Sequence, residues 1–361
     1  LWTYHHPVHI TAGLGAFERL CELVPQGPVL LVTTAGSTRR GVTARVRAQL
    51  GQERVKVYDK VTPNPELDVL DAMTSAWQVE ALSSVVSLGG GSVLDAGKVL
   101  GVTLACGLEK PLDKVLRQGQ PQVWERRLPV FAIPTTSGTG AEVTPFATVW
   151  DSIIHKKYSV TGENIYPVHA VLDPTLTLTL PYQETLYTGL DAISHALESL
   201  WNRNRTPLSA AFALQALELA IGALPDVLES PDNLEQRARM QQASLLAGLA
   251  ISQTRTAIAH SISYPLTSHH NVPHGLACSF TLVAIARFIQ EQAPDFFSTY
   301  QRIITSAVHL LNALDLRKHL GQFVDYGSVQ TVIPEMITKE RSGNFLFPVD
   351  LALVEEVLNR A

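Results

Sequence analysis

Four residues of types that bind divalent metals occur at two places in the second half of the sequence. Asp191 and His195 are four positions apart, which puts a carboxylate and an imidazole on one face of a helix, about one turn apart. His260 and His274 are too far apart for one helical turn. A helix end followed by a loop could fold His274 back toward His260. Together the four side chains would supply three nitrogen donors and one oxygen donor to a metal ion.

Two segments rich in glycine and hydroxyl groups follow apolar runs in the first half. Residues 89–98 read GGGSVLDAGK and residues 134–142 read PTTSGTGAE. Glycine lets the backbone approach a phosphate, and a helix N-terminus offers unpaired N–H groups. Neither segment is a G-x-G-x-x-G motif or a P-loop, so a structural turn is the alternative for each, but two of them at one sheet edge favour a dinucleotide. The candidate cofactor-binding residues here are Gly89, Gly90, Gly91, Ser92, Asp95, Thr135, Thr136 and Thr139.

The order of apolar patterns predicts two domains. Short runs at 29–33, 85–88, 130–133 and 170–174 alternate with helical stretches, which is typical of a doubly wound, mostly parallel sheet that binds ligands at the carboxyl ends of its strands. From Pro181 onward helical periodicity dominates, with Pro225 expected to end a helix that begins at Pro207. We therefore predict an α/β dinucleotide-binding domain over residues 1–180 and an all-α metal-binding domain over residues 181–361.

Composition excludes several classes of protein. The chain has 361 residues, 46% of them hydrophobic and 17% charged, which favours a large buried core over disorder. The net charge of −5 comes without a basic run, so no nucleic-acid partner is expected. Three cysteines without CxxC spacing favour a reducing cytoplasm, and no uninterrupted apolar segment of transmembrane length is apparent.

The residues after the first strand bear on the choice of cofactor. An acidic residue there would bond the adenosine ribose and repel a 2′-phosphate. This chain instead has Thr34 and Ser37, followed by Arg39 and Arg40. Small hydroxyl residues and nearby arginines tolerate a phosphate, so NADP(H) is favoured over NAD(H), with Thr34 and Ser37 as cofactor-binding candidates.

Five ordered motifs resemble those of the iron-containing (group III) alcohol dehydrogenases, over nearly the whole chain. The resemblance implies a dinucleotide-binding domain, a helical domain and a catalytic divalent metal in the cleft between them. It places the metal ligands at Asp191, His195, His260 and His274, and Lys157 near the nicotinamide ribose. Fe²⁺ is the expected metal, with Zn²⁺ and Ni²⁺ as alternatives, and a homo-oligomer such as a dimer is implied. The motifs are residues 89–98, 134–142, 173–174, 189–198 and 273–275.

Residues 201–207, 254–269 and 341–345 are similar to the phosphonoacetaldehyde reductase branch of this family. We therefore predict an NAD(P)H-dependent oxidoreductase that interconverts phosphonoacetaldehyde and 2-hydroxyethylphosphonate, with neutral or carboxylated short aldehydes as alternative substrates. Arg203 and Arg205 read as solvated or capping residues, and a clamp for an anionic substrate is the second interpretation.

Tyr264 and His270 are the catalytic candidates, as conduits for a proton from water, and packing is the alternative for both. Many relatives carry a histidine where this chain has Tyr264, so a proton relay cannot be copied from them. Cys278 reads as a small buried hydrophobe, and the cluster of His5, His6 and His9 reads as ordinary surface histidines.

Two other classes of function are compatible with parts of this pattern. A lyase that resembles the dehydroquinate synthases would bind both NAD and a metal, but Asp191 and the 273–275 motif count against it. A non-catalytic nucleotide-binding protein would leave four intact ligand positions unexplained.

Overall fold

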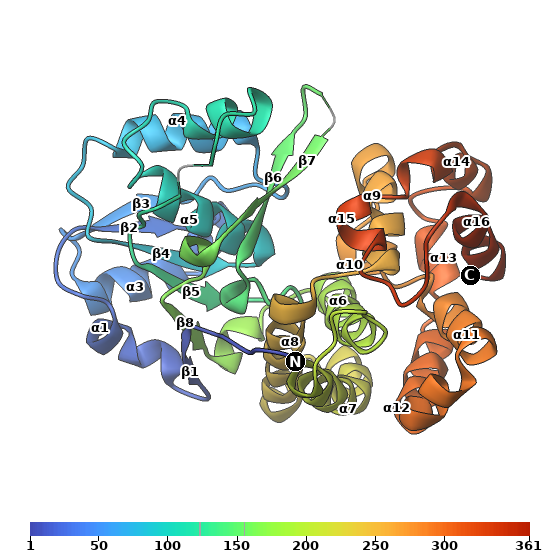
Figure 1. Ribbon diagram of the computed structural model, residues 1–361. Coiled ribbons are helices and arrows are strands. Elements are labelled where there is room, and N and C mark those ends of the chain that lie inside the picture. The colour runs from blue at the N-terminus through green and yellow to red at the C-terminus, as the bar shows by residue number, and fades with distance from the viewer. Residues whose placement is uncertain (123, 155) are drawn as a thin grey trace. The chain divides into compact units, whose positions relative to one another are not determined.

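The computed structural model describes residues 1–122, 124–154 and 156–361, which divide into two compact units (Figure 1). One, the sheet unit, consists of His5–Thr136 and Ala141–Thr177. The other, the helical unit, consists of Leu1–Tyr4, Ser137–Gly140 and Leu178–Ala361. Each unit has its own hydrophobic core.

A six-stranded parallel sheet forms the centre of the sheet unit, in the order β1-β8-β5-β4-β2-β3. The predicted doubly wound parallel sheet is therefore confirmed. The four predicted runs correspond to β2, β4, β5 and β8, whereas β1 and β3 were not predicted. The strands are β1 His9–Ala12, β2 Val29–Val32, β3 Val55–Tyr58, β4 Ser84–Gly89, β5 Val130–Pro134 and β8 His169–Leu172.

Alternation along the strands explains why helices cover both faces of this sheet. In β2, Leu30 and Val32 pack with α4 and α5, while Val29 and Leu31 pack with α1 and α3, because successive side chains of a strand point to opposite faces. Figure 1 shows the two helix pairs on opposite sides of the strands. Their bounds are α1 Leu20–Leu23, α3 Val42–Leu50, α4 Leu67–Trp77 and α5 Gly91–Thr103.

An antiparallel hairpin, β6 Phe146–Asp151 with β7 Lys156–Thr161, forms a second sheet in this unit. It was not predicted. The β6 strand alternates buried and partly exposed residues, so only one of its faces is covered. The short helices of the unit are α2 Ala35–Arg39, η1 Ala16–Arg19, η2 Asp113–Arg117, η3 Ala141–Val143, η4 Glu163–Ile165 and η5 Pro174–Thr177.

Two glycines let α5 lie directly on the sheet. A Cβ atom at Gly97 would be 1.6 Å from the Ser87 Oγ, and one at Gly101 would be 2.5 Å from a Val130 methyl carbon. Any side chain at these positions would push the helix away from β4 and β5. The close packing fixes the glycine-rich loop before α5 at the carboxyl edge of the sheet.

The helical unit contains no ladder-forming strand among its described residues, as predicted for the second half of the chain. Its longest helices, α6 to α8, pack against one another. The helices are α6 Tyr182–Leu200, α7 Pro207–Glu229, α8 Leu234–Thr254, α9 Ile258–His270, α10 His274–Ala277, α11 Leu282–Gln292, α12 Pro294–Ala313, α13 Leu316–Leu320, α14 Tyr326–Thr331, η6 Ile333–Glu335, α15 Lys339–Ser342 and α16 Leu351–Arg360.

Helix α7 continues through Pro225 to Glu229, so the prediction that Pro225 ends this helix was wrong. Proline removes one backbone hydrogen bond and disfavours a helical interior. Here Leu224 and Val227 are both buried in the core, and packing of these neighbours keeps the last turn helical. Tertiary contacts have overridden a local preference.

By length and composition, α7 is also apolar enough to cross a membrane, contrary to the expectation that no segment reaches this length. The buried face of α7 packs against α6 and α8. A core helix of this kind passes the same test of length and apolarity. We therefore interpret α7 as a core helix of the helical unit.

Candidate metal centre and nucleotide site

Helix α6 presents a row of buried polar side chains on one face. Asp191 and His195 are 3% and 4% exposed, and Glu198 is fully buried. Their positions, i, i+4 and i+7, recur on one side of a helix. Polar groups are rarely buried without partners, so this face must meet matching groups on other elements.

The other two predicted ligands lie at the starts of α9 and α10. His260 is in the first turn of α9, and His274 is the first residue of α10. Asn271 ends α9 in the left-handed conformation, with φ of 53°, and so turns the chain back as the sequence required. A Cβ atom at Gly275 would be 1.8 Å from the Tyr187 carbonyl oxygen, so α10 lies against α6 at a point where only glycine fits.

The structure brings all four predicted ligand side chains together. The Nε2 atoms of His195, His260 and His274 lie 3.5, 3.6 and 3.9 Å from the Asp191 Oδ1. Among the described residues, the buried His260 Nε2 has no hydrogen-bond partner. Three imidazole nitrogens around one carboxylate oxygen fit a divalent cation of borderline softness. Their role as metal ligands remains a prediction.

Two outer contacts hold the imidazoles in this orientation. The His260 Nδ1 lies 2.6 Å from the Glu198 Oε2, and the His195 Nδ1 lies 3.3 Å from the Gly138 carbonyl oxygen. A partner at Nδ1 fixes the tautomer and turns Nε2 toward a metal. Glu198 was not proposed from the sequence, although its spacing from Asp191 and His195 was a signal that could have identified it.

The charges in this group favour a cation. Burial would raise the pKa of Asp191, but the neighbouring imidazoles, led by His195, hold it well below its usual range. Burial lowers the pKa of His195 and so favours the neutral, ligating form. Burial also opposes protonation of His260, yet Cys278 and Glu198 outweigh it and raise the pKa of His260 well above its usual range. The buried carboxylates therefore attract positive charge.

Cys278 is closer to this centre than the sequence indicated. It is buried as expected, but its Sγ lies 3.4 Å from the Asp191 Oδ1. One ligand atom from each of Asp191, His260, His274 and Cys278 lies within 4.8 Å of the others. The interpretation of Cys278 as only a small hydrophobe was incomplete. Its position four residues after His274 was the available signal.

The two catalytic candidates lie at different places along α9. Tyr264 is one turn after His260 and partly exposed. His270 is the last residue of the helix, about 15 Å along the axis from His260 at 1.5 Å per residue. Among the described residues, the group of candidate ligand atoms within 4.8 Å of one another includes neither His270 nor His195, although the His195 Nε2 lies 3.5 Å from the Asp191 Oδ1.

The histidines near the N-terminus do not gather around a common point. The His5 Nε2 lies 3.0 Å from Glu163, and the His6 Nε2 lies 3.0 Å from the Val143 carbonyl oxygen. The His9 ring packs against that of His169. Separate partners favour the interpretation of this cluster as ordinary histidines.

The predicted nucleotide-binding loops meet at a topological switch point of the sheet. The chain runs from β2 to β3 on one side and returns to β4 on the other side of β2, and ligands bind at such points in open α/β sheets. Thr34 follows β2 and caps α2, where its Oγ1 accepts a hydrogen bond of 3.2 Å from the Ser37 N–H. A Cβ atom at Gly90 would be 3.3 Å from the Thr136 Cγ2, so the loops after β4 and β5 are adjacent.

Several predicted cofactor residues have contacts within the protein. The Ser92 Oγ accepts from the Asn64 N–H at 3.3 Å, and the Thr135 N–H donates to the Gly89 carbonyl at 3.0 Å. Asp95 accepts from the Thr148 N–H at 2.8 Å and is paired with Lys98 at 3.1 Å. Asp95 therefore anchors α5 to the hairpin, whatever it contributes to cofactor binding.

The remaining cofactor candidates belong to three different segments. The Lys157 Nζ is 5.3 Å from the centre of the Trp150 ring in the β6–β7 hairpin. Thr139 belongs to the Ser137–Gly140 segment of the helical unit, and Gly91 is the first residue of α5.

The two arginines considered as an anion clamp already have partners. The Arg203 Nε donates to the Phe345 carbonyl at 3.0 Å, and an Arg205 amino group donates to the Leu200 carbonyl at 2.6 Å. The Arg205 guanidinium also lies 4.9 Å from the centre of the Phe296 ring. These contacts support the capping interpretation.

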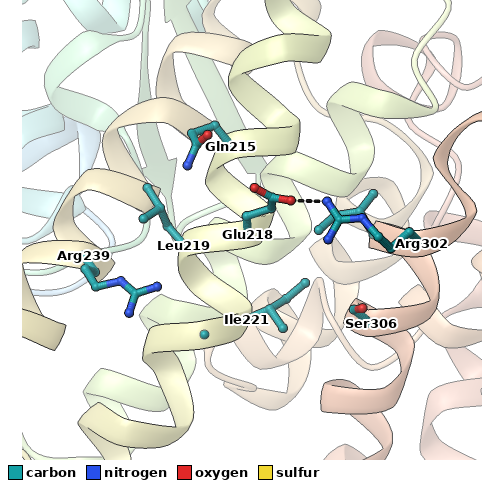
Figure 2. A pocket seen from close by; sticks show the side chains of 9 residues that line it. Gln215, Glu218, Leu219, Ile221, Arg239, Arg302 and Ser306 are labelled. Atoms are coloured by element: carbon teal, nitrogen blue, oxygen red, sulfur yellow. Dashed lines mark hydrogen bonds and ion pairs between the residues drawn. The ribbon is translucent and has the colours of Figure 1, made fainter.

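A hollow of about 390 Å³ lies elsewhere in the helical unit, on α7, α8 and α12. Figure 2 shows its side chains, including Arg302 paired with Glu218. It contains none of the four predicted metal ligands, and its two arginines are already engaged by Glu218 and Gln236. We therefore assign the chemistry to the buried group and not to this hollow.

A switch-point nucleotide site and a buried centre of three imidazoles and a carboxylate are together typical of metal-dependent dehydrogenases. Residues 7–174 match the model of the iron-containing alcohol dehydrogenases, and residues 185–326 match that of the C-terminal part of the Fe-containing alcohol dehydrogenase family. The chain belongs to the iron-containing alcohol dehydrogenase family, and it is an oxidoreductase of alcohols and aldehydes.

Similar proteins differ in their substrates. A choline dehydrogenase of Bacillus subtilis is 31% identical over 82% of this chain and 75% of its own length. A phosphonoacetaldehyde reductase of Streptomyces viridochromogenes is 36% identical over 64% of this chain and 62% of its own. The solved structure of a sulfoacetaldehyde reductase from Bifidobacterium kashiwanohense, in complex with NAD⁺, is 26% identical with a TM-score of 0.87, covering 100% of this chain and 97% of its own. Family membership therefore defines the reaction class but not the substrate.

Proposed function

We propose that the protein is a metal-dependent NAD(P)H oxidoreductase that reduces phosphonoacetaldehyde to 2-hydroxyethylphosphonate and catalyses the reverse oxidation. The observation that carries the metal-dependent chemistry is the convergence of three histidine Nε2 atoms on the Asp191 Oδ1. Family membership favours this oxidoreductase over a lyase or a non-catalytic nucleotide-binding protein.

Asp191, His195, His260 and His274 are the residues that would hold the metal, with Fe²⁺ preferred and Zn²⁺ or Ni²⁺ compatible with the same donors. A bound divalent cation supplies polarisation of the aldehyde oxygen and stabilises the negative charge that develops on it. The lowered pKa of Asp191 keeps its carboxylate ionised for this task. Glu198 holds the His260 ring through Nδ1, so that Nε2 would be free to bind the ion.

The end of β2 supports NADP(H) as the cofactor, which supplies hydride to the carbonyl carbon. Thr34 and Ser37 stand there in place of an acidic residue, and an Arg40 amino group lies 3.4 Å from the Ser37 Oγ. A hydroxyl pair beside a guanidinium suits a 2′-phosphate. Gly89, Gly90 and the N-terminus of α5 would receive the pyrophosphate, with the remaining loop residues and Lys157 as further contacts.

Reduction also requires a proton on the product oxygen, and we assign its delivery from water to Tyr264. This residue is partly exposed and one turn from His260, which is the placement expected of a group that passes a proton between the buried group and solvent. His270, the second predicted conduit, lies at the far end of α9 and would act only through intervening water.

The substrate assignment draws on similarity to the phosphonoacetaldehyde reductase and on the sulfoacetaldehyde reductase, whose names specify aldehydes with an anionic group. A short neutral or carboxylated aldehyde is the alternative, because other relatives act on different substrates. We further propose that the enzyme is cytoplasmic and forms a homodimer.

The test is oxidation of NADPH and NADH by the Fe²⁺-loaded enzyme with phosphonoacetaldehyde, propionaldehyde and succinic semialdehyde. We expect turnover with NADPH and the highest kcat/KM for phosphonoacetaldehyde. Asp191→Ala and His260→Ala should lose bound metal and turnover, whereas His269→Ala, a change of an exposed histidine on the same helix, should keep both. Full turnover by a rigorously demetallated sample would contradict the proposal.

A further inference from the structure

We propose that Arg341 binds the anionic end of the substrate, so that the enzyme selects short aldehydes carrying a phosphonate, sulfonate or carboxylate group. This inference rests on the proposed aldehyde reductase function and adds the residue that determines its specificity. The sequence directed attention to Arg203 and Arg205 instead, and both of these are engaged by the protein.

The first step is that Arg341 is held beside the turn that carries His260. Helix α15, which contains Arg341, packs against α9. The Thr338 N–H, at the start of α15, donates to the Ser261 Oγ at 2.8 Å, and Ser261 donates to the Met336 carbonyl at 2.7 Å. Because Ser261 follows His260 directly, these bonds tie α15 to the candidate metal centre.

Hydrogen bonds of Asn344 also hold the chain on the C-terminal side of Arg341. The Asn344 Nδ2 donates to the Thr256 carbonyl at 2.9 Å, just before α9 begins. The Arg203 N–H donates to the Asn344 carbonyl at 2.9 Å. The backbone around Arg341 is therefore anchored both before and after it, which a positioned binding group requires.

The Arg341 guanidinium is a cation with unused hydrogen-bonding capacity. Its residue is partly buried, and its electrostatic neighbours are Glu340, Glu198 and Tyr264. Among the described residues, its side chain forms no hydrogen bond or ion pair that would use its five N–H donors. Burial lowers the pKa of Arg341, but arginine stays charged in proteins. A partly desolvated guanidinium whose N–H groups have no hydrogen-bond partner among the described residues is suited to an incoming anion.

Glu198 cannot be the missing partner, although it is close enough to interact electrostatically with Arg341. Its Oε1 accepts from the N–H groups of Ala259 and His260, at 2.6 and 3.3 Å. Its Oε2 accepts from the Ala257 N–H at 3.0 Å and faces the His260 Nδ1 at 2.6 Å. A carboxylate has about four acceptor sites, and here all are occupied.

The position of Arg341 suits a substrate that has a carbonyl at one end and an anion at the other. Glu198 bonds the ring of His260, and Tyr264 follows His260 by one turn, so two of the three electrostatic neighbours of Arg341 adjoin the candidate metal centre. A planar guanidinium fork matches pairs of phosphonate, sulfonate or carboxylate oxygens. An aldehyde oxygen at the metal centre would then leave the anionic group of a short substrate facing Arg341.

The test compares Arg341→Gln and Arg341→Lys with wild type as Fe²⁺-loaded holoenzymes using NADPH. For Arg341→Gln, we expect kcat/KM for phosphonoacetaldehyde to fall roughly 10- to 100-fold, mainly through KM, as for loss of charged hydrogen bonds. The value for propionaldehyde, which is neutral and of similar length, should change less than about threefold. Arg341→Lys should fall between wild type and Arg341→Gln, because it keeps the charge but loses the fork.

Lys339→Gln provides the matched control, because it removes an exposed positive charge from the same helix. It should retain wild-type kinetics with both aldehydes. Inhibition of unmodified holoenzyme by ethylphosphonate, competitive with the aldehyde and stronger than inhibition by propanol, gives a readout that does not depend on folding of a variant.

Two failures are distinguishable. If the holoenzyme reduces propionaldehyde but Arg341→Gln has equal effects on both aldehydes, or none, the role of Arg341 is wrong while the reductase function stands. If ethylphosphonate does not compete with the aldehyde, the same conclusion holds. If the wild-type holoenzyme does not oxidise NADPH with any of the aldehydes tested, the proposed function fails and this inference fails with it.

Discussion

At the scale of single residues, Glu198 is the strongest addition that the structure makes to the candidate metal centre. It is fully buried and bonds the His260 Nδ1 together with three backbone N–H groups. Burial raises the pKa of Glu198, but His260 and these N–H groups together lower it below its usual range. Its carboxylate therefore stays ionised and holds the His260 ring in a single orientation.

We expect Glu198→Gln to weaken metal binding about 10- to 100-fold, the usual cost of losing an outer partner of a ligand histidine. The amide keeps the size of the side chain but lacks the charge that orients Nδ1–H. Competition with a chelator, followed by measurement of bound metal, gives the affinity. Glu335→Gln is the control, because Glu335 pairs with the exposed His269. Equal metal retention by both variants would remove Glu198 from the centre.

The sequence identified the predicted metal ligands of this centre better than the residues that position them. Asp191, His195, His260 and His274 stood out because their types and order were informative. Glu198 and Cys278 could also have been identified from helical spacing in the sequence. Arg341 could not, because its position depends on the contact between Ser261 and Thr338, which are far apart in sequence and meet only in the fold.

At the scale of elements, α5 is fixed to the following segments by a buried charge cluster. Lys98 is fully buried and donates to the Ala141 carbonyl at 2.9 Å and to the Thr144 Oγ1 at 3.2 Å. Glu142, in η3, is 2% exposed. Burial raises the pKa of Glu142 to about 7, against an opposing effect of Lys98. The packing of α5, which follows the glycine loop, therefore depends on a contact whose charge changes with pH.

This carboxyl group should make stability depend on pH. Between its ordinary pKa of 4.5 and about 7, the folded protein keeps the Glu142 proton while the unfolded chain has lost it. The free energy of unfolding should therefore fall as pH rises through this window, by on the order of 3 kcal/mol in total. Glu142→Gln, which is always neutral, should match wild type near pH 5 and be more stable near pH 8.

Chemical denaturation of wild type and Glu142→Gln at both pH values measures this difference. Glu125→Gln, a change of an exposed carboxylate in the same unit, corrects for the general effect of removing a negative charge. A stability difference that does not vary with pH would show that Glu142 titrates normally.

The strands show which elements a sequence can predict. β2, β4 and β5 are buried along their whole length, so they appear as continuous runs of branched and apolar residues. β1 and β3 are the edges of the sheet and are partly exposed. Their mixed compositions, HITA and VKVY, resemble loops, and only pairing with β8 and β2 makes them strands.

At the scale of the whole molecule, the two candidate sites draw mainly on different compact units, with Thr139 as the one predicted cofactor residue in the helical unit. All four predicted metal ligands belong to the helical unit. Thr34, Ser37, the glycine loop and Lys157 belong to the sheet unit. Each unit has a separate hydrophobic core, so one site can be emptied while the fold that supports the other is retained.

We therefore expect metal removal to abolish turnover and to lower the thermal stability, while NADPH binding changes less than about threefold. At a free metal concentration 100 times the Kd, binding stabilises the protein by about 2.7 kcal/mol, so re-addition of Fe²⁺ should restore the lost stability. Calorimetric titration with NADPH before and after chelation measures the first effect, and thermal unfolding measures the second. Loss of NADPH binding together with the metal would show that the two sites are not independent.

The contact between Gly275 and the Tyr187 carbonyl limits how this sequence can change. The backbone of α10 lies so close to α6 that even one methyl group at position 275 overlaps a main-chain oxygen, and a main-chain oxygen cannot rotate aside. His274 is the adjacent residue, so its imidazole stays in register with the α6 donors only while position 275 carries hydrogen alone. In a library with every amino acid at each codon near this centre, selection for activity should retain varied residues at the exposed His269 and a single one at 275.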